Sequence, residues 1–375
     1  MQNPGVRPSL STSQPTTSTG SSDLDKILSH QGLPLGNSLL IEESGTTDFA
    51  SVLLRAFAAQ GIMHNRITAN ANAKELHSHV IVLGMAPQWA NDLPGLYKGS
   101  SKEQKKAKIA ENESKVSVSN IAHGSNLPRG DQKMKIAWRY GLNAKDMEKE
   151  NDAGEMNAAY EHYSHQFDLT SKLQPGPNPQ EISFVPISDT VSAIIKQLKN
   201  IVQAQLRSNP LKTVRLVIPG FLNPSIYPPQ LTAPTFAFPL IHSLRSLLRQ
   251  FENNLVMVSS LALDLYPRQS NLTGVLESLF DSSIHLQPFN QEMSQWIERA
   301  YKNEPAKIQQ GLVDIIKIPV LSERGLMMVH TGEFAFKNGR KRFEIEEWGI
   351  PVEVDSKEEA HDNGEKSQTT KNIDF

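Results

Sequence analysis

The chain has 375 residues with 38 lysines and arginines against 40 aspartates and glutamates, so its formal net charge is −2. A charge this close to zero produces no global field for nucleic acid or membrane, and any RNA contact needs a local basic patch. Cysteine is absent, which excludes disulfides, thiol nucleophiles and thiolate metal sites. No apolar run could span a bilayer and residues 1–22 carry no apolar signal segment, so we expect a soluble protein of the cytoplasm and nucleus without a membrane partner.

Composition along the chain predicts one folded domain with two tails and an insertion. Residues 1–22 are mainly serine, threonine, proline and glycine, which is typical of a disordered polar tail. Residues 97–133 interleave lysines with serine, glutamate and asparagine, and we expect a mobile lysine-rich insertion there. Residues 354–375 lean acidic and predict a second disordered tail. The folded domain is therefore expected over residues 23–353.

The first unit of the domain is expected to be a strand, a loop and a helix. Leu39–Ile41 is a short apolar run, and Ala50–Ala59 can form a helix that ends at Gly61. This order is typical of a P-loop NTPase, in which glycine amides face the phosphates, a lysine meets the β/γ charge and a Ser or Thr hydroxyl holds Mg²⁺. We interpret the loop between the two elements as a degenerate phosphate loop made of Glu43, Ser44, Gly45, Thr46, Thr47 and Asp48.

Two of the residues that follow Gly45 differ from those of a working phosphate loop. Aligned on Gly45, the lysine place falls on Asp48 and the hydroxyl place falls on Phe49. An aspartate repels a triphosphate, and exchanging +1 for −1 removes an attraction on the order of a few kcal/mol at the surface of a protein. The alternative interpretation is an ordinary turn in a fold unrelated to P-loop NTPases, since a lone loop motif also occurs by chance.

The strands expected next also end without acidic residues. Residues 79–83 form an apolar strand followed by Gly-Met, where a RecA-type ATPase carries a glutamate. Residues 214–218 form another, followed by Pro-Gly, where the aspartate for Mg²⁺ would stand. Because three groups needed for hydrolysis are absent at their expected places, we predict no catalytic residue and a RecA-like P-loop fold with degenerate nucleotide-binding motifs.

The other elements predict an α/β fold with a mostly parallel central sheet and a β-rich C-terminal part. Strands that alternate with helices form βαβ units, whose sheets are parallel. An amphipathic helix is expected at Val191–Leu206, capped by Ser188 or Asp189, and a second helix at Leu240–Phe251. Asn338-Gly339 favours a tight hairpin turn. Further strands are expected at 134–140, 167–169, 255–259, 312–320, 326–329 and, in a C-terminal β-hairpin, 334–336 with 342–345.

Six short motifs carry a resemblance to a known family. The most specific is the Lys-x-x-Trp-Arg-Tyr string of residues 135–140, because no generic chemistry would make it recur by chance. The others are Ser18-Thr19-Gly20 with Leu24-Asp25 and Leu28, Leu33 to Gly36, Leu39 to Glu43, His165 to Thr170, and Arg340 to Phe343. Over roughly residues 8–351, apart from the insertion, the chain resembles the PAXNEB family, the fourth subunit of the Elongator complex.

The resemblance implies a RecA-like accessory subunit without ATPase motifs of its own. Members of this family form a heterohexameric ring with the fifth and sixth Elongator subunits. The ring binds tRNA and supports the modification of wobble uridines by the catalytic Elongator subcomplex. This subunit alone is expected to bind no cofactor, with ATP at the ring interfaces. The alternatives are an active NTPase with an atypical site and a RecA-type DNA recombination mediator.

The implied ring suggests where tRNA would be contacted. In RecA-like rings the loops after the central strands line the pore, so Arg268 and the Pro-rich loop 221–234 are the first candidates. The cations Arg340, Lys341 and Arg342 on the hairpin are the second candidates. A solvated turn that discourages edge pairing explains these hairpin cations equally well.

Two further groups of residues have less specific patterns. In a strand over 134–140, alternate side chains enter the core, so Arg139 would face outward and is a candidate interface residue. His162 and His165 are three residues apart and could share a helix face with Glu161, but no third ligand is evident. We therefore expect no metal site.

Overall fold

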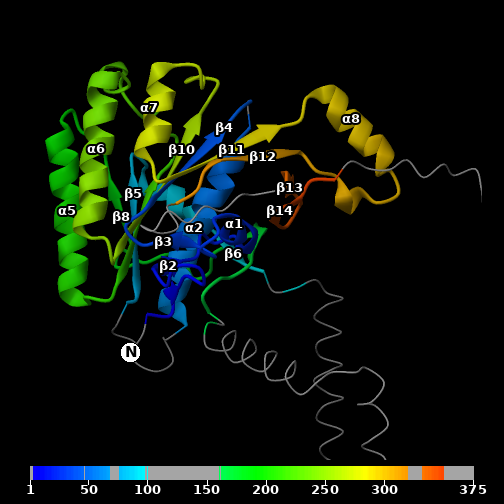
Figure 1. Ribbon diagram of the computed structural model, residues 1–375. Coiled ribbons are helices and arrows are strands. Elements are labelled where there is room, and N and C mark those ends of the chain that lie inside the picture. Colours follow the sequence, from blue (N-terminus) through cyan, green and yellow to red (C-terminus); the bar gives the residue numbers. More distant parts are fainter. Residues whose placement is uncertain are drawn as a thin grey trace, which may run out of the picture.

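A nine-stranded sheet forms the centre of the protein (Figure 1). The computed structural model describes residues 3–45, 47–67, 76–97, 99, 160, 162–319 and 332–349. From edge to edge, the strands are β14 (Phe343–Glu347), β13 (Phe334–Asn338), β12 (Gly311–Lys317), β11 (Ser282–Pro288), β4 (Ser38–Glu43), β10 (Leu255–Ala262), β9 (Thr213–Ile218), β5 (Ser78–Leu83) and β8 (Ile182–Val185). From β11 to β8 all neighbours are parallel, whereas β12, β13 and β14 add antiparallel pairs. The expected α/β class with a mostly parallel central sheet is confirmed.

Helices cover both faces of this sheet. The helices of the described chain are α1 (Ser22–Ile27), α2 (Phe49–Arg66), α5 (Val191–Ser208), α6 (Pro234–Gln250), α7 (Asn271–Leu279) and α8 (Gln291–Ala300). In Figure 1, α5, α6 and α7 lie side by side at one side of the sheet, and α8 lies toward the other end of the molecule. Alternate strand residues serve two separate core clusters: Leu39 and Ile41 pack in the cluster of α2, and Leu40 packs in that of α5 and α6.

Residues 3–36, which we call the N-terminal strap, are folded against the sheet. The strap contains α1 and a small sheet of β1 (Arg7–Pro8), β2 (Pro15–Thr17) and β3 (Leu33–Pro34). Asn3 is buried, and its side-chain amide donates to the carbonyl oxygens of His77 at 2.9 Å and Leu211 at 2.8 Å. The prediction of a disordered tail is therefore wrong for residues 3–22.

Arg215 on β9 explains why such a polar segment is ordered. Its side chain is fully buried and donates to the carbonyl oxygens of Ser18 at 2.8 Å and Phe57 at 3.2 Å, and to the Thr17 hydroxyl at 2.6 Å. Burial lowers the pKa of Arg215 to about 10, so the group is still charged at neutral pH. Asp25 in α1 is also buried, and burial raises the pKa of its carboxyl. Hydrogen bonds to the buried Arg215 hold the strap against the sheet, and the composition of the strap does not reveal them.

Helix α2 is longer than the sequence predicted. It runs through Gly61, where we expected it to end. A Cβ atom at this position would lie 2.7 Å from Cδ of Arg215. The glycine therefore allows the helix to approach β9 closely and does not end the helix.

Several other boundaries differ from the prediction. The cap of α5 is Thr190, whose hydroxyl accepts from the Ala193 amide, and not Ser188 or Asp189. The strand expected at 167–169 is β7 (Phe167–Lys172), which pairs with β6 (Pro94–Leu96) outside the central sheet. Strands β8 and β11 and helix α8 were not predicted.

Some predicted features lie outside the described residues. They are the strands at 134–140 and 326–329, Arg139, the tail 354–375, and the insertion 97–133 apart from Tyr97 and Gly99.

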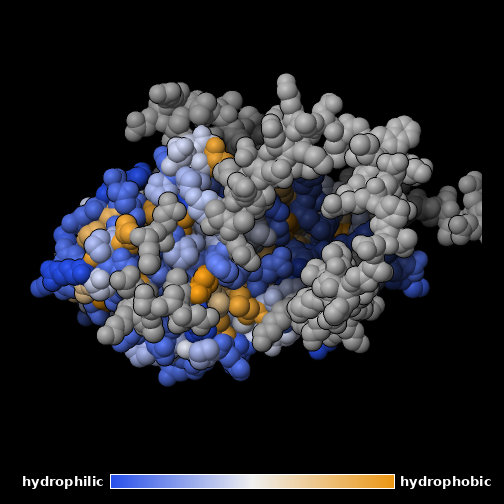
Figure 2. Space-filling model, turned by 90° about the horizontal axis from the view of Figure 1, so that it is seen from below, coloured by the Kyte–Doolittle hydropathy of each residue, from blue (hydrophilic) through white to orange (hydrophobic). Residues whose placement is uncertain are grey.

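The surface near the N-terminal end is mostly hydrophilic. Figure 2 views the molecule from below and shows small apolar areas separated by hydrophilic surface. Leu10 and Leu211 are the most exposed large apolar side chains in the described ranges, at 63% and 60%. Within the same ranges, no helix combines the length and the apolar character needed to cross a bilayer.

Lowering the pH from about 7 to about 4.5 should destabilise the protein, because His79 is neutral in the folded state. Its buried ring contacts the Gln180 carbonyl oxygen and the Ser183 hydroxyl, each at 2.9 Å. Burial lowers the pKa of His79 from 6.5 to about 4, so between these values the unfolded chain binds more protons and stability decreases as the pH is lowered. A pKa shift of this size changes the free energy of unfolding by about 3 kcal/mol at most.

Urea unfolding at several pH values measures this effect. The urea midpoint should decrease in the native protein as the pH is lowered, and decrease less steeply in His79→Gln. A midpoint that has the same pH dependence in both proteins would contradict the assignment to His79.

Candidate functional site

A cavity of about 380 Å³ lies at the carboxyl ends of β4, β5, β9 and β10. Ligands of open α/β sheets bind at this edge. Asp48, at the place of the phosphate-loop lysine, lines this cavity. So do Met85, Pro219 and Gly220, which follow the two strands where a RecA-type ATPase carries acidic residues. The structure therefore brings the degenerate phosphate loop and both altered strand ends to one place.

The carboxylate of Glu43 occupies the N-terminal end of α2. Its Oε1 accepts from the Phe49 amide at 2.8 Å and from the Thr47 hydroxyl, and its Oε2 accepts from the Ala50 amide at 2.9 Å. The amide N–H groups of a first helical turn are the donors that hold a phosphate in a working loop. Glu43 is 7% exposed and satisfies these donors with an internal negative charge. A phosphate at the same place would compete with a carboxylate that is part of the chain.

The two residues at the lysine and hydroxyl places have different surroundings. Asp48 is exposed, and its side chain makes no capping hydrogen bond to α2. The Phe49 ring packs against the rings of Phe336 at 4.8 Å and Phe343 at 6.4 Å between centroids. The residue at the hydroxyl place thus ties α2 to β13 and β14. Thr46 lies outside the described residues.

The rest of the cavity is lined by uncharged polar groups, apolar groups and one cation. The Ser260 hydroxyl accepts from the Gly220 amide at 2.8 Å. Arg55 and Trp89 line the wall formed by α2 and the short 3₁₀ helix η1 (Pro87–Asp92). In the part of the chain that the structure describes, no group of three or more His, Asp or Glu side chains could hold a metal ion.

Arg268 is bound within the protein by two carboxylates. Its guanidinium donates to Glu42 and, through Nε, to Glu277 at 3.0 Å. Glu42 is fully buried, and burial raises its pKa to about 7 although the hydrogen bond from Arg268 acts in the opposite direction. A phosphate would have to displace both carboxylates to bind this guanidinium. That Arg268 contacts tRNA stays a prediction, and this geometry does not favour it.

The cations of the C-terminal hairpin differ in their partners. Lys337 forms an ion pair with Glu344 at 3.3 Å, and Arg342 forms one with the same carboxylate at 3.1 Å. Arg340 and Lys341 are exposed, and neither forms an ion pair with another described residue. These two are the sequence-predicted cations that can meet an external phosphate.

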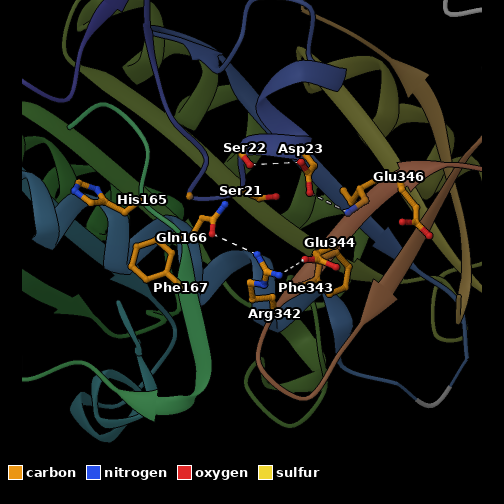
Figure 3. A pocket seen from close by; sticks show the side chains of 12 residues that line it. Ser21, Ser22, Asp23, His165, Gln166, Phe167, Arg342, Phe343, Glu344 and Glu346 are labelled. Carbon is orange, nitrogen blue, oxygen red and sulfur yellow. Dashed lines mark hydrogen bonds and ion pairs between the residues drawn. The ribbon is translucent and has the colours of Figure 1, made fainter. Parts of the chain in front are cut away.

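Arg342 also borders a second cavity, of about 350 Å³ (Figure 3). Its guanidinium points toward the Gln166 side-chain oxygen at 3.4 Å and stacks over the Tyr97 ring at 4.7 Å. Three segments that are distant in sequence line this cavity, namely residues 20–23, 165–167 and 342–346. Each segment overlaps or adjoins a motif that carries the family resemblance, so these motifs meet in space.

The two histidines considered for a metal lie close together and are held by protein groups. The rings of His162 and His165 stack at 6.3 Å between centroids. Nδ1 of His165 lies 3.0 Å from the side-chain nitrogen of Gln60 on α2, and burial lowers the pKa of this histidine to about 4. Glu161 lies outside the described residues.

Sequence reasoning placed Glu43 in the degenerate loop but missed what its carboxylate does. The available signal was a pair of acids at the end of β4, where a working phosphate loop begins with glycine and neutral residues. A carboxylate that ends a strand six residues before a helix begins can reach the first helical turn, as Glu43 does.

Comparisons with known proteins agree on one family. A family model described as PAXNEB protein matches residues 1–375. Elongator complex protein 4 of Saccharomyces cerevisiae is 44% identical over 378 residues, which cover 98% of this chain and 82% of that protein. The Schizosaccharomyces pombe protein of the same name is 27% identical, with 99% and 95% covered. The human one is 28% identical over 48% of this chain and 34% of its own length. The resemblance seen in the motifs is confirmed, and the chain belongs to the PAXNEB family.

Proposed function

We propose that this chain is a non-catalytic, RecA-like subunit of the Elongator complex that supports tRNA modification. Its relatives carry the name Elongator complex protein 4, and the match covers nearly the whole chain. The strand, loop and helix formed by β4 and α2, with a cavity at the carboxyl ends of the strands, support a RecA-like origin.

One observation carries the non-catalytic part of this proposal. The Glu43 carboxylate fills the anion site at the start of α2 that a nucleotide phosphate would need. Since no described residue supplies the lysine, the water-orienting glutamate or the Mg²⁺ aspartate at the aligned positions, losing the Glu43 carboxylate alone would not create an ATPase.

The proposal includes partners that complete the assembly. The chain forms a heterohexameric ring with the fifth and sixth Elongator subunits, and the ring acts beside the catalytic Elongator subcomplex. ATP binds at the ring interfaces and not to this subunit alone. The start of α2 supports this division, because the Glu43 carboxylate already occupies the amides there that would bind a phosphate.

The purified full chain should hydrolyse no ATP above the rate in buffer. Release of phosphate from ATP with Mg²⁺ measures this rate. Asp48→Lys restores one of the missing groups and should also give no turnover, because the other groups are still absent. Turnover by the native chain that disappears in Asp48→Ala would contradict the proposal.

In the assembled ring, replacing both Arg340 and Lys341 with alanine should weaken tRNA binding. Each phosphate contact that is lost should flatten the dependence of log K on log salt by about 0.7 for single-stranded regions. Titration of labelled tRNA at several salt concentrations measures both the affinity and this slope.

A charge-matched control comes from α5. Lys196 and Arg207 are exposed on this helix, which packs beside β8 at the opposite edge of the sheet from β14. Their double alanine variant removes the same charge and should bind tRNA as the native ring does. Equal weakening in both variants would show that overall charge, and not the hairpin, determines binding.

A further inference from the structure

Three side chains on neighbouring strands form a chain of hydrogen bonds beside the degenerate loop. Ser44 follows β4, His285 lies on β11, and Asp314 lies on β12. The Ser44 hydroxyl lies 2.7 Å from Nε2 of His285, and Nδ1 of His285 lies 3.2 Å from a carboxylate oxygen of Asp314. The strands fix this order, since His285 is directly opposite Asp314 in the register of β11 and β12.

The partners decide where the protons are. A carboxylate only accepts, so Nδ1 of His285 carries a proton and donates it to Asp314. Burial, and then the nearby Arg268, lower the pKa of His285, which favours the neutral ring. In a neutral ring with a protonated Nδ1, Nε2 accepts the hydrogen of the Ser44 hydroxyl. The hydrogen bonds therefore run in the direction found in a catalytic triad. A nucleophile donates to a general base, and the base donates to a residue that orients it.

The backbone around Ser44 also fits a nucleophile. Ser44 directly follows β4 in the loop that leads to α2, and the amide after it can stabilise an oxyanion, as the corresponding amide does in a nucleophile elbow. That amide belongs here to Gly45, which has φ +88° and donates to the exposed Asp264 carboxylate at 3.2 Å. The nearest atom that a Cβ at Gly45 would meet is a Pro288 side-chain carbon at 3.8 Å, so a substrate can approach.

We propose that Ser44 is an activated nucleophile that takes the acyl group of an ester, with His285 as its general base and Asp314 as the residue that orients His285. This activity goes beyond the proposed function, in which non-catalytic refers to ATP hydrolysis, and either proposal can fail while the other stands.

The reaction consumes only the ester and one water molecule. Ser44 Oγ bonds to the acyl carbon as its proton passes to His285 Nε2, and the bond to the alcohol breaks as the alcohol oxygen takes that proton. Water then attacks the acyl carbon and gives its proton to Nε2. The bond to Oγ breaks, a carboxylic acid leaves, and Ser44 recovers its proton.

The same geometry sets the substrate class. The Ser44 amide donates to the Leu286 carbonyl oxygen at 3.2 Å and is engaged in the sheet. The oxyanion therefore has the Gly45 amide as its donor, and the Asp264 carboxylate competes for that amide. With one contested donor, we expect esters with good leaving groups to react and amides to be left intact.

Hydrolysis of p-nitrophenyl acetate by the full chain tests the proposal. Ser44→Ala should remove the turnover, and His285→Gln should lower it about a hundredfold. Asp314→Asn should lower kcat and leave KM unchanged, because an amide that donates to Nδ1 favours the wrong tautomer of His285. Asp264→Ala should raise the rate, because it frees the Gly45 amide and removes a charge that opposes the oxyanion; a merely structural Asp264 would not have this effect.

Two measurements keep the test independent of folding defects. A fluorophosphonate probe on the native chain should label Ser44, as mapped by peptide mass. Ser192→Ala, an exposed serine on α5 beside the opposite edge of the sheet, is the matched control and should leave the rate unchanged. Labelling at another serine, or equal turnover by the native chain and Ser44→Ala, would overturn the proposal and leave the hydrogen-bond chain as a purely structural contact.

Discussion

Replacing Arg215 with methionine should lower the free energy of unfolding by about 3–5 kcal/mol, the usual cost of removing one partner from a buried charged network. The methionine fills much of the same volume but donates no hydrogen bond. The carbonyl oxygens of Ser18 and Phe57 and the Thr17 hydroxyl would each lose a buried donor. Urea unfolding followed by circular dichroism measures the loss.

The control for this change is Arg207→Met on α5. Arg207 is exposed, so the same substitution there should change stability by less than about 0.5 kcal/mol. In Arg215→Met we also expect the N-terminal strap to become sensitive to protease, since Arg215 is its buried anchor. A loss of stability below about 1 kcal/mol with a protected strap would show that the other contacts of the strap suffice.

Replacing Glu43 with alanine should destabilise the protein by about 2–3 kcal/mol, because a buried carboxylate that accepts two amide hydrogen bonds at a helix start is lost. The variant should then be stabilised by inorganic phosphate, since the freed amides of α2 form an anion site. Ligand binding to the folded state raises stability with concentration. Thermal unfolding in increasing phosphate measures this, with the native protein in parallel.

Asp48→Ala is the matched control for Glu43→Ala. It removes one negative charge from the same cavity, but Asp48 makes no capping hydrogen bond to α2. We therefore expect little destabilisation and no more response to phosphate than in the native protein. If phosphate stabilises all three proteins equally, the anion site at α2 is not occupied by Glu43 in solution.

The elements with a strong apolar pattern were predictable from the sequence. β4, β5, β9 and β10 are rich in apolar residues because helices cover both faces of the sheet, and each appeared at its predicted place. The amphipathic pattern of α5 likewise located that helix within a few residues. The carboxyl ends of parallel strands meet at one edge of the sheet, so the place of the cavity beside Glu43 also followed from the sequence.

The parts that could not be predicted depend on polar contacts between distant residues. The strap as far as residue 22 was assigned to a tail because that part has few apolar side chains, and its hydrogen bonds to Arg215 leave no local signal. Arg268 was expected on a loop that lines the pore of the ring, but it is held by carboxylate partners, Glu42 and Glu277, that come from β4 and α7. Strand β11 was missed because Ser282, Ser283 and His285 interrupt its apolar pattern although all three are buried.

The N-terminal strap also constrains how the chain is made. The bond between Arg215 and the Ser18 carbonyl joins residues 197 positions apart. At synthesis rates of about 5–20 residues per second, the strap leaves the ribosome at least about 10 seconds before its buried anchor is available. During that interval its small polar side chains are well suited to stay in water without aggregating. The composition that made this segment look like a tail thus has a use while the chain is being synthesised.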